Sequence, residues 1–375
     1  MVYYIGFYDT MTDGHFSRAV SPAAVRKMDY VIDKIAQLGK DITVVSTARA
    51  NAKTKGLQNK VRVNDRIKID YFPLGNFSAK LLRSASEKLM PLWLFLYCLF
   101  RIGKDDKVVY YHSPVTDGAV RIAKKLKKFD LIAEIEEIYS LVWNRNRRDT
   151  RSEQRFLRQC TEKAIVVSES LKNYLKHPTA VVSYGSYATC TKPKIRRNDD
   201  DIMLVYSGAF DKVKGGAFAA LEIMQHLPEN YRLVLSGKCS DALLPELHEK
   251  IAQINASRGE DNVRFAGLLP EEDFEQLLRS ADIALNLQNE GAFSGFLFPS
   301  KLLTYLCYDL PVVTTPGESI TASSLSDILY ITGDYDAESI VQTILSVDID
   351  HEDDYRRRLT EMDAQFVRQL GELLQ

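Results

Sequence analysis

Short apolar runs alternate with helical segments along the whole chain. The runs are rich in branched and aromatic residues, and many end at Gly, Ser or Pro, the pattern of a buried β-strand. We predict strands over 2–8, 41–47, 67–73, 107–113, 131–137, 163–168 and 179–185 in the first half, and over 201–208, 231–237, 263–268, 283–288, 311–315 and 328–333 in the second. Strands that alternate with helices in this way indicate parallel sheets covered by helices on both faces.

Apolar residues at helical spacing predict a helix near each end of the chain. The first runs over 22–38, with Pro22 in its first turn and Gly39 after its end. Its apolar face comprises Val25, Met28, Ile32, Ile35 and Leu38. The last segment, 351–375, has an apolar face made by Leu359, Met362, Phe366, Leu370 and Leu373. This terminal helix must dock on a domain, and it can cross back to the first one.

Chain length and a change of composition near the middle predict two domains. The 375 residues are too many for one ordinary core, for which about 150 residues are typical. Residues 186–200 combine small, proline and charged residues without apolar periodicity, so we predict a linker there. We therefore expect an α/β fold of two Rossmann-like, doubly wound domains, 1–185 and 201–350, facing a cleft, followed by the helix in 351–375.

The composition is that of a globular chain, with 45% hydrophobic and 26% charged residues. The five cysteines never form a C-x-x-C pair, which argues against structural zinc. The longest stretch without a charged or strongly polar side chain, 89–100, is shorter than the roughly 20 residues of a spanning helix, and no signal-peptide pattern is present. We therefore expect a cytoplasmic protein. The motifs of P-loop hydrolysis, dinucleotide redox chemistry, zinc proteolysis and nucleophile-elbow hydrolysis are absent from the sequence.

The net charge of −1 conceals a strong asymmetry between the two halves. Residues 1–190 carry +13 and residues 191–375 carry −14. A basic half attracts anionic partners such as acidic lipid headgroups or phosphorylated acceptors, but opposite charges can also simply face each other across a cleft. Because no nucleic-acid recognition motif accompanies the charge, we expect no nucleic-acid partner.

Two segments of the second half have the chemistry of anion-binding sites. In the first, a strand ends at Gly208, and a polar loop with Lys214 and Gly215 leads into an apolar helix. Glycines let a backbone approach phosphate and a lysine adds positive charge, although an ordinary β-to-α turn uses the same glycines for packing. In the second, Ser300 and Lys301 open a helix behind a later strand, which gives another helix start that attracts anions.

The run from 201 to 315 resembles the donor domain of GT-B glycosyltransferases, family 4 in particular. The shared features are G-x5-K-G, L-P-E-E-D-F-x-x-L-L-x-x-A-D-I and F-P-S-K-L-L-x-Y-L-x-x-x-x-P-V-V. The resemblance implies a GT-B fold, a nucleotide-sugar donor, retention of anomeric configuration and no required metal. It also implies that Lys214 holds the diphosphate.

Several positions differ from the family pattern. Ala209 occupies the position where an arginine usually follows the strand glycine, and Thr304 falls where the family has the acidic residue that holds the ribose. The first acidic residue of that spaced pair falls at Phe296, while Glu290 and Gly291 lie earlier in the loop. Either a longer loop brings Glu290 to the sugar, or that contact is missing.

The first half contributes two candidates for the acceptor site. His112 ends a predicted strand, where family 4 enzymes often keep a histidine near the transferred sugar, although a lone histidine there is often structural. Glu134 and Glu136 share one face of the next strand, and Glu137 lies at its carboxyl end. We take His112 and Glu137 as the catalytic candidates.

Residues 88–104 form an apolar segment whose aromatic residues surround the helix rather than follow one stripe. Basic residues near it are Lys80, Arg83, Lys88, Arg101, Lys104 and those of the run 145–148. Two interpretations fit this pattern. One is a core helix buried on all sides, and the other is a helix that meets lipid in an enzyme bound peripherally to the inner face of a membrane.

We therefore expect a retaining, metal-independent glycosyltransferase that moves a sugar from a nucleotide-sugar donor, UDP-sugar above all, to a saccharide or lipid-linked saccharide in surface glycan assembly. The donor-binding candidates are Gly208, Lys214, Gly215, Glu290, Gly291, Ser300, Lys301 and Thr304. We expect no metal site at Asp199–Asp201, because these carboxylates precede a strand rather than follow one. The alternatives are a GT-B nucleotide-sugar epimerase and a catalytically silent GT-B subunit that binds glycan or protein.

Overall fold

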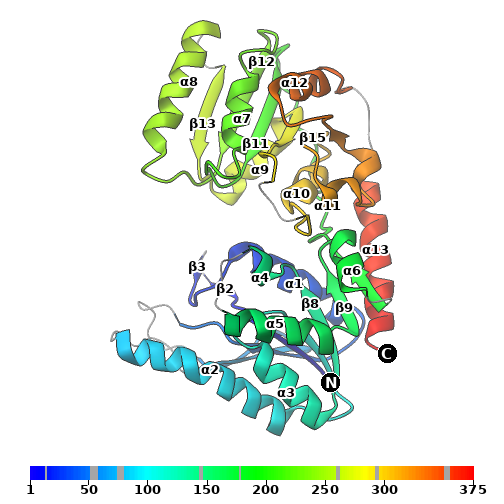
Figure 1. Ribbon diagram of the computed structural model, residues 1–375. Coiled ribbons are helices and arrows are strands. Elements are labelled where there is room, and N and C mark those ends of the chain that lie inside the picture. Colours follow the sequence, from blue (N-terminus) through cyan, green and yellow to red (C-terminus); the bar gives the residue numbers. More distant parts are fainter. Residues whose placement is uncertain are drawn as a thin grey trace. The chain divides into compact units, whose positions relative to one another are not determined.

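The computed structural model describes residues 1–12, 15–50, 58–73, 80–142, 147–176, 179–258, 262–291, 295–349 and 355–375. The chain forms two compact units (Figure 1). The first comprises Met1–Ser186 with Ala364–Gln375, and the second comprises Tyr187–Asp363. Each unit is built around its own mainly parallel sheet, as the alternation of strands and helices predicts.

The sheet of the first unit contains all seven strands predicted for that half. In spatial order its strands are β10 (Thr179–Val182), β9 (Lys163–Val166), β8 (Asp130–Ile135), β7 (Lys107–Tyr111), β1 (Val2–Gly6), β4 (Ile42–Ser46), β6 (Ile67–Tyr71) and β5 (Lys60–Arg62). Strand β5, which is antiparallel to β6, was not predicted, because it is a short, largely exposed edge without an apolar run. Neither was the short hairpin of β2 (Met11–Thr12) and β3 (His15–Phe16).

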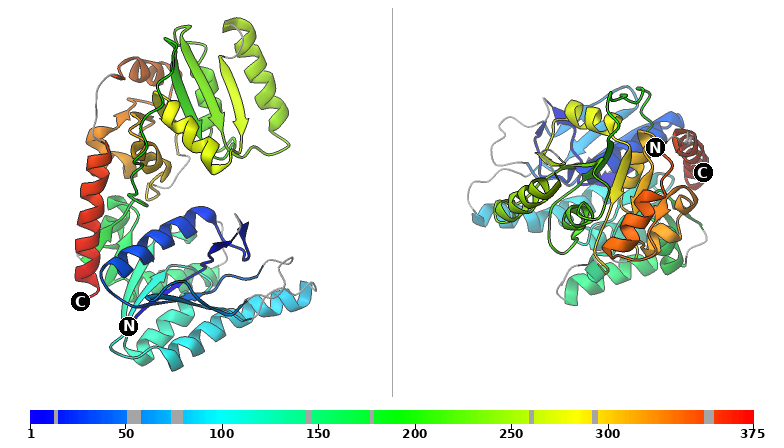
Figure 2. Two further views of the ribbon diagram at one scale, coloured as in Figure 1. Left: turned by 180° about the vertical axis from the view of Figure 1, so that it is seen from behind. Right: turned by 90° about the horizontal axis from the view of Figure 1, so that it is seen from above.

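Helices cover both faces of this sheet. They are α1 (Pro22–Gln37), α2 (Lys80–Arg101), α3 (Asp117–Lys127), α4 (Tyr139–Val142), α5 (Arg147–Gln159), α6 (Glu169–Leu175) and, from Ala364 on, α13 (Tyr355–Leu373). The chain crosses from β1 to β4 in one direction and from β6 to β7 in the other, so right-handed crossovers place α1 and α2 on opposite faces (Figures 1 and 2). Helix α1 confirms the prediction for 22–38. Within the described residues, no helix is long and apolar enough to cross a membrane.

The last helix, α13, is tied to the first unit by its final three turns. The ring of Phe366 is buried and stacks on Tyr30 of α1, with 5.4 Å between the ring centroids. Lys163 donates a hydrogen bond of 3.0 Å to the carbonyl of Leu373, and Lys107 donates one of 2.7 Å to the carbonyl of Gln375. Apolar packing and two lysine contacts therefore hold this end of the chain in place.

The second unit contains all six strands predicted for its half. Their spatial order is β13 (Val263–Gly267), β12 (Tyr231–Ser236), β11 (Ile202–Ser207), β14 (Ile283–Asn286), β15 (Val312–Thr314) and β16 (Tyr330–Ile331). Its helices are α7 (Gly216–Ile223), α8 (Leu244–Arg258), α9 (Glu271–Ser280), α10 (Lys301–Cys307), α11 (Glu318–Thr321) and α12 (Ala337–Leu345). The strand order reverses between β11 and β14. In open α/β sheets, ligands bind outside the carboxyl ends of the strands at such a reversal.

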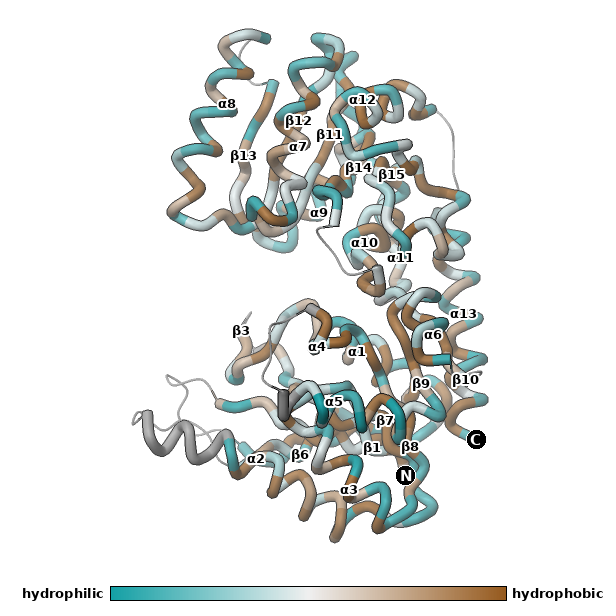
Figure 3. The backbone as a smooth tube through the Cα atoms, in the orientation of Figure 1, coloured by the Kyte–Doolittle hydropathy of each residue, from teal (hydrophilic) through white to brown (hydrophobic). Residues whose placement is uncertain are grey.

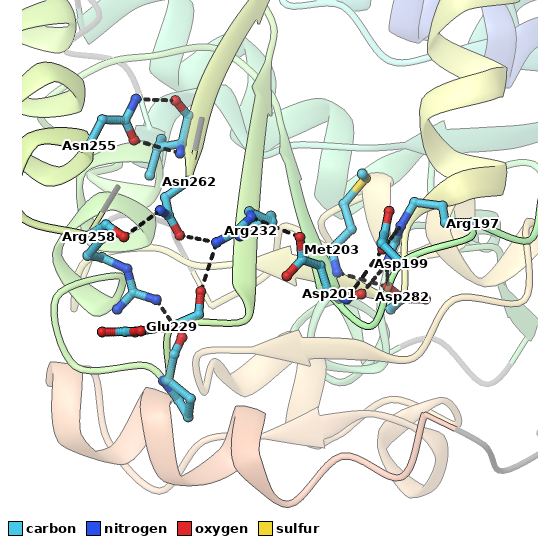
Figure 4. A network of polar contacts seen from close by, with 12 residues as sticks. Arg197, Asp199, Asp201, Met203, Glu229, Arg232, Asn255, Arg258, Asn262 and Asp282 are labelled. Carbon is cyan, nitrogen blue, oxygen red and sulfur yellow. Dashed lines mark hydrogen bonds and ion pairs between the residues drawn. The ribbon is translucent and has the colours of Figure 1, made fainter. Parts of the chain in front are cut away.

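The segment predicted as a linker lies against the second unit (Figure 4). Arg197 pairs with Asp282 at 2.7 Å and with Asp199 at 3.1 Å. Arg232 of β12 pairs with Asp201 at 3.0 Å. Two of the three consecutive aspartates are thus partners of arginines, and the pairs Arg197–Asp282 and Asp201–Arg232 fasten this segment to the strand starts of the second sheet.

Replacing Phe366 by Ala removes a buried ring and its stacking on Tyr30. We expect the free energy of unfolding of the first unit to fall by about 3–5 kcal/mol, the usual cost of such a change in a core. Urea unfolding followed by tryptophan fluorescence measures this unit, because both tryptophans of the sequence, at 93 and 143, belong to it. The exposed neighbour Gln365 provides the control, and Gln365→Ala should change stability by less than about 0.5 kcal/mol. Equal stability of the two variants would contradict the docking of α13.

Candidate functional site

Three glycines form a continuous backbone surface at the carboxyl ends of β11, β12 and β13. A Cβ atom on Gly237 would lie 1.8 Å from the carbonyl oxygen of Gly208, so only glycine allows this approach. The amide of Gly237 also donates a hydrogen bond of 2.8 Å to the carbonyl of Gly267. All three glycines are partly exposed. A ligand can therefore approach the backbone at the end of each strand without meeting a side chain of these residues.

The loop after β11 is held by the loop after β14, across the reversal of strand order. Asn289 donates its backbone N–H to the carbonyl of Lys214 at 2.8 Å, and its side-chain amide donates to the carbonyls of Lys212 and Val213. Gly215 has a φ of +69°, and a Cβ atom there would lie 2.0 Å from the side-chain oxygen of Asn289. The position of Lys214 thus depends on Asn289. Sequence reasoning missed this residue, because only the fold brings the two loops together.

The amino group of Lys301 lies at the same reversal. Its Nζ atom is 4.2 Å from the centre of the Tyr206 ring and 3.4 Å from the carbonyl oxygen of Ser207. Burial, together with the positive charge of Lys214, lowers the pKa of Lys301 to about 7. Among the described residues, no carboxylate forms an ion pair with Lys301. The charge of Lys214 thus acts on the amino group of Lys301 at the end of β11, where a bound anion would be stabilised by both cations.

The other donor-binding candidates lie on α10 and in the loop after β14. Ser300 is the N-cap residue of α10 but makes no hydrogen bond there with its side chain. Thr304 follows one turn later and is half-buried. Glu290 and Gly291 are exposed in the loop, and the charge of Glu290 adds to the burial that raises the pKa of Tyr335. The structure thus brings Gly208, Lys214, Gly215 and Lys301 together, and it places Glu290 beside Tyr335.

In the first unit, His112 is enclosed by side chains of three helices. Its ring is 1% exposed and stacks on Phe156, with 5.6 Å between the centroids. Its Nε2 atom lies 3.2 Å from Asp117 and 3.5 Å from Glu153, which also accepts the backbone N–H of Tyr139. Burial lowers the pKa of His112, but the two carboxylates outweigh this effect and the pKa is raised. The ring therefore contacts residues of three helices, α3, α4 and α5.

The acidic residues of β8 belong to a buried polar network. Glu134 is fully buried and accepts a hydrogen bond of 2.6 Å from the Tyr4 hydroxyl. The carboxylate of Glu136 lies 3.7 Å from the amino group of Lys27, a buried residue of α1 that sequence reasoning missed. Glu137 follows the strand and is partly exposed. Of the three glutamates, Glu134 therefore serves packing within the unit, and Glu137 has access to solvent.

Comparison with known proteins identifies the fold. Residues 189–364 match the sequence model of the family described as glycosyl transferases group 1, whereas a search of curated protein sequences found no match. Sucrose-phosphate synthase from Thermosynechococcus elongatus has a TM-score of 0.69 at 12% identity, over 99% of this chain and 97% of the other. HepE from Anabaena, in complex with UDP, has a TM-score of 0.65 at 13% identity, over 100% and 99%. The protein has the GT-B fold.

A third GT-B structure is equally similar. The lipopolysaccharide outer core galactosyltransferase WaaB, in its apo form, has a TM-score of 0.64 at 12% identity, over 99% of this chain and 98% of the other. These likenesses confirm the predicted GT-B fold class. All eight donor-binding candidates lie inside the region 189–364 that matches the family.

Glu134 provides a test of the buried network in the first unit. Burial, together with the charge of Glu136, raises the pKa of Glu134 from 4.5 to about 8. The native state thus holds a proton that the unfolded chain releases, and stability is lost as the pH rises through this range. Gln keeps an oxygen for the Tyr4 hydroxyl but does not titrate. We expect Glu134→Gln to gain stability relative to the wild type, by at least about 1 kcal/mol, between about pH 5 and pH 8.5.

Urea unfolding at the two pH values measures this relative gain. Glu162, an exposed carboxylate of the same unit, is the control, and Glu162→Gln should show no comparable dependence on pH. A constant difference between Glu134→Gln and the wild type would mean that Glu134 does not carry a raised pKa.

Proposed function

We propose that this protein is a family 4 glycosyltransferase that transfers a sugar from a nucleoside diphosphate, in the simplest case UDP, to a saccharide acceptor. One observation carries the proposal: at the reversal of strand order in the second sheet, the positive charge of Lys214 acts on the amino group of Lys301 and lowers its pKa. A diphosphate has the charge that two neighbouring ammonium groups favour, and it relieves the repulsion between them. The match of residues 189–364 to glycosyl transferases group 1 supports this assignment.

The strand ends supply a surface long enough for a nucleotide rather than a lone phosphate. The glycine backbone runs from β11, next to Lys301, to β13. Directly after β13, the side chain of Leu268 is 78% exposed. We propose that the base packs on Leu268 while the diphosphate lies at the two lysines. The UDP in the complex of HepE supports uridine as the nucleoside.

We propose that residues of α10 and of the loop before it bind the ribose and the sugar. Thr304 lies one turn after Lys301, and its hydroxyl offers the ribose one hydrogen-bonding group instead of the two oxygens of a carboxylate. We propose that Glu290 and Gly291 contact the sugar, and that Ser300 contributes its hydroxyl to the phosphate.

We propose that transfer proceeds with retention and without a metal ion. As the bond between the anomeric carbon and the diphosphate oxygen breaks, negative charge develops on the leaving diphosphate, and the two lysines stabilise it. The acceptor hydroxyl forms its new bond on the same face of the sugar, and its proton passes to the leaving phosphate oxygen. Glu137 is the proposed group on the acceptor side. His112, enclosed by Asp117 and Glu153, is proposed to hold the helices around that region.

The proposed acceptor is a saccharide carried by a lipid, used in assembly of a surface glycan. The charge of +13 on residues 1–190 supports an acceptor with anionic character. The outer core of lipopolysaccharide, on which WaaB acts, is an acceptor of this class.

A binding screen tests the donor assignment first. Thermal unfolding is measured with UDP, GDP, ADP, CDP and dTDP at millimolar concentration, without and then with magnesium. A ligand present at about 100 times its dissociation constant stabilises the native state by roughly 2.7 kcal/mol. We expect a shift with one diphosphate without magnesium. No shift with any nucleotide would favour a silent subunit, and conversion of the sugar nucleotide without an acceptor would favour an epimerase.

Lys301 gives the proposal a pH signature. Since its pKa is about 7, Lys301 must take up a proton to bind a diphosphate above that pH, and affinity should fall as the pH rises from about 7 to 9. Calorimetry of UDP binding at about pH 8 in buffers of different ionisation enthalpy should show this uptake. Lys301→Ala should abolish the uptake and weaken binding about 10- to 100-fold. Lys212, in the same loop but paired with Glu246 at 2.7 Å, is the control, and Lys212→Ala should bind normally. Unchanged binding and uptake in Lys301→Ala would refute this phosphate site.

A substitution at Leu268 tests the proposed base contact separately from the diphosphate contact. Replacing its exposed side chain by Ser removes the apolar surface after β13 without disturbing the lysines. We expect Leu268→Ser to weaken UDP binding about tenfold and to leave pyrophosphate binding unchanged. Leu345→Ser, which changes an exposed leucine of α12, is the control. If pyrophosphate binding fell equally in Leu268→Ser, the base would not lie at this residue.

A further inference from the structure

Helix α2 presents an apolar stripe to solvent. Its inward side is formed by Leu94 and Cys98, which are fully buried, and by Tyr97, whose hydroxyl donates to Asp70 at 2.6 Å. The outward stripe consists of Leu89, Leu92, Leu96 and Phe100, with Phe100 76% exposed. These residues follow one another at spacings of three, four and four, so they lie on one helical face. The interpretation of this segment as a core helix buried on all sides is therefore wrong.

Helix α3 extends the exposed apolar area. It packs side by side with α2 in the layer that covers one face of the first sheet (Figures 1 and 3). Its outward apolar residues are Val115, just before the helix, and Ile122 and Leu126 within it. We call these three residues and the four of α2 the α2–α3 surface. Contiguous exposed apolar residues of this kind mark an interaction site rather than ordinary exposure.

Most charged residues around the α2–α3 surface are basic. In the described stretches 88–104 and 115–128, they are Lys88, Arg101, Lys104, Arg121, Lys124, Lys125, Lys127 and Lys128. The sole acidic residue in these stretches, Asp117, is fully buried. None of the eight cations forms an ion pair with another described residue. Helix α5, which packs against α3, adds the exposed Arg151, Arg155 and Arg158.

We propose that the α2–α3 surface docks on the anionic surface of a lipid bilayer, with its apolar side chains among the acyl chains near the headgroups. Exposed leucine and phenylalanine side chains supply the apolar contact, and a ring of lysine and arginine matches the charge of acidic lipids. Long basic side chains also reach the headgroups while their aliphatic stems stay beside the apolar residues. The proposal rests on the first unit alone and holds whether or not the donor assignment is correct.

Charge decides between a bilayer and a second copy of the chain. A symmetric dimer through this surface would place the same basic patch against itself, so like-charged lysine and arginine side chains would be brought together. Like charges across an interface cost several kcal/mol, and no described acidic side chain on these helices is exposed to offset them. An acidic membrane, in contrast, attracts these basic groups.

Vesicle sedimentation with the full chain tests the proposal. We expect binding to vesicles of phosphatidylcholine with about 30% phosphatidylglycerol, much weaker binding to phosphatidylcholine alone, and loss of most binding at about 1 M salt. Lys125→Glu with Lys128→Glu reverses two exposed charges and should raise the dissociation constant at least tenfold, since each basic residue near the surface contributes about fivefold. The matched control, Lys40→Glu with Lys250→Glu, changes two exposed lysines elsewhere and should bind within about threefold of the wild type.

The apolar part is tested separately. Phe100→Ser with Leu126→Ser should weaken binding about tenfold or more and leave the salt dependence intact, whereas Leu345→Ser should bind like the wild type. Circular dichroism verifies that each variant is folded, and the exposed lysine pairs preserve the test if the serine variant is not. Equal binding to neutral and acidic vesicles, or no vesicle binding at all, would overturn the proposal. Concentration-dependent dimerisation that Phe100→Ser abolishes, without lipid binding, would assign the surface to a second copy instead.

Discussion

The candidate site of the second unit depends on a largely desolvated ammonium group that forms no ion pair with a carboxylate of the described residues. Lys301 lies over the ring of Tyr206 and beside the carbonyl of Ser207, and Lys214 brings a second positive charge. Desolvation and repulsion both disfavour the charged lysine, so the unliganded protein bears a cost at this position. A ligand with two or more negative charges removes both penalties at once. Relief of these two penalties thus contributes to the free energy of ligand binding.

The backbone makes this arrangement available to a ligand. At the reversal of strand order between β11 and β14, the loops after these two strands diverge at the carboxyl end of the sheet. Asn289 joins the two loops by hydrogen bonds. Glycine at 237 is required because a Cβ atom there would lie 1.8 Å from the carbonyl oxygen of Gly208. The reversal of strand order, the loops held by Asn289 and the close glycine contact therefore occur at the same end of the sheet. None of them alone would create a site.

Much of this could be predicted from the sequence. The buried strands can be predicted because each is a local apolar run. The glycine loop with Lys214 can be predicted because its residues are adjacent in the sequence. What could not be predicted depends on contacts between distant residues. Asn289 looks like an ordinary loop residue until the fold sets it against Gly215, and a strand-end histidine gives no sign of the carboxylates that enclose it. An edge strand as polar as β5 has no apolar pattern to detect.

The exposed face of α2 and α3 has a consequence for how the protein would find a lipid-borne acceptor. A protein held on a bilayer by that face searches for such a molecule by diffusion in two dimensions, within a layer a few nanometres deep. The relevant concentration is then the mole fraction of the acceptor among the lipids rather than its amount per volume of solution. Confinement raises the effective concentration in the same way as a tether between two binding partners. A modest affinity for the saccharide would suffice for turnover, and dilution of the acceptor with other lipids would slow the reaction.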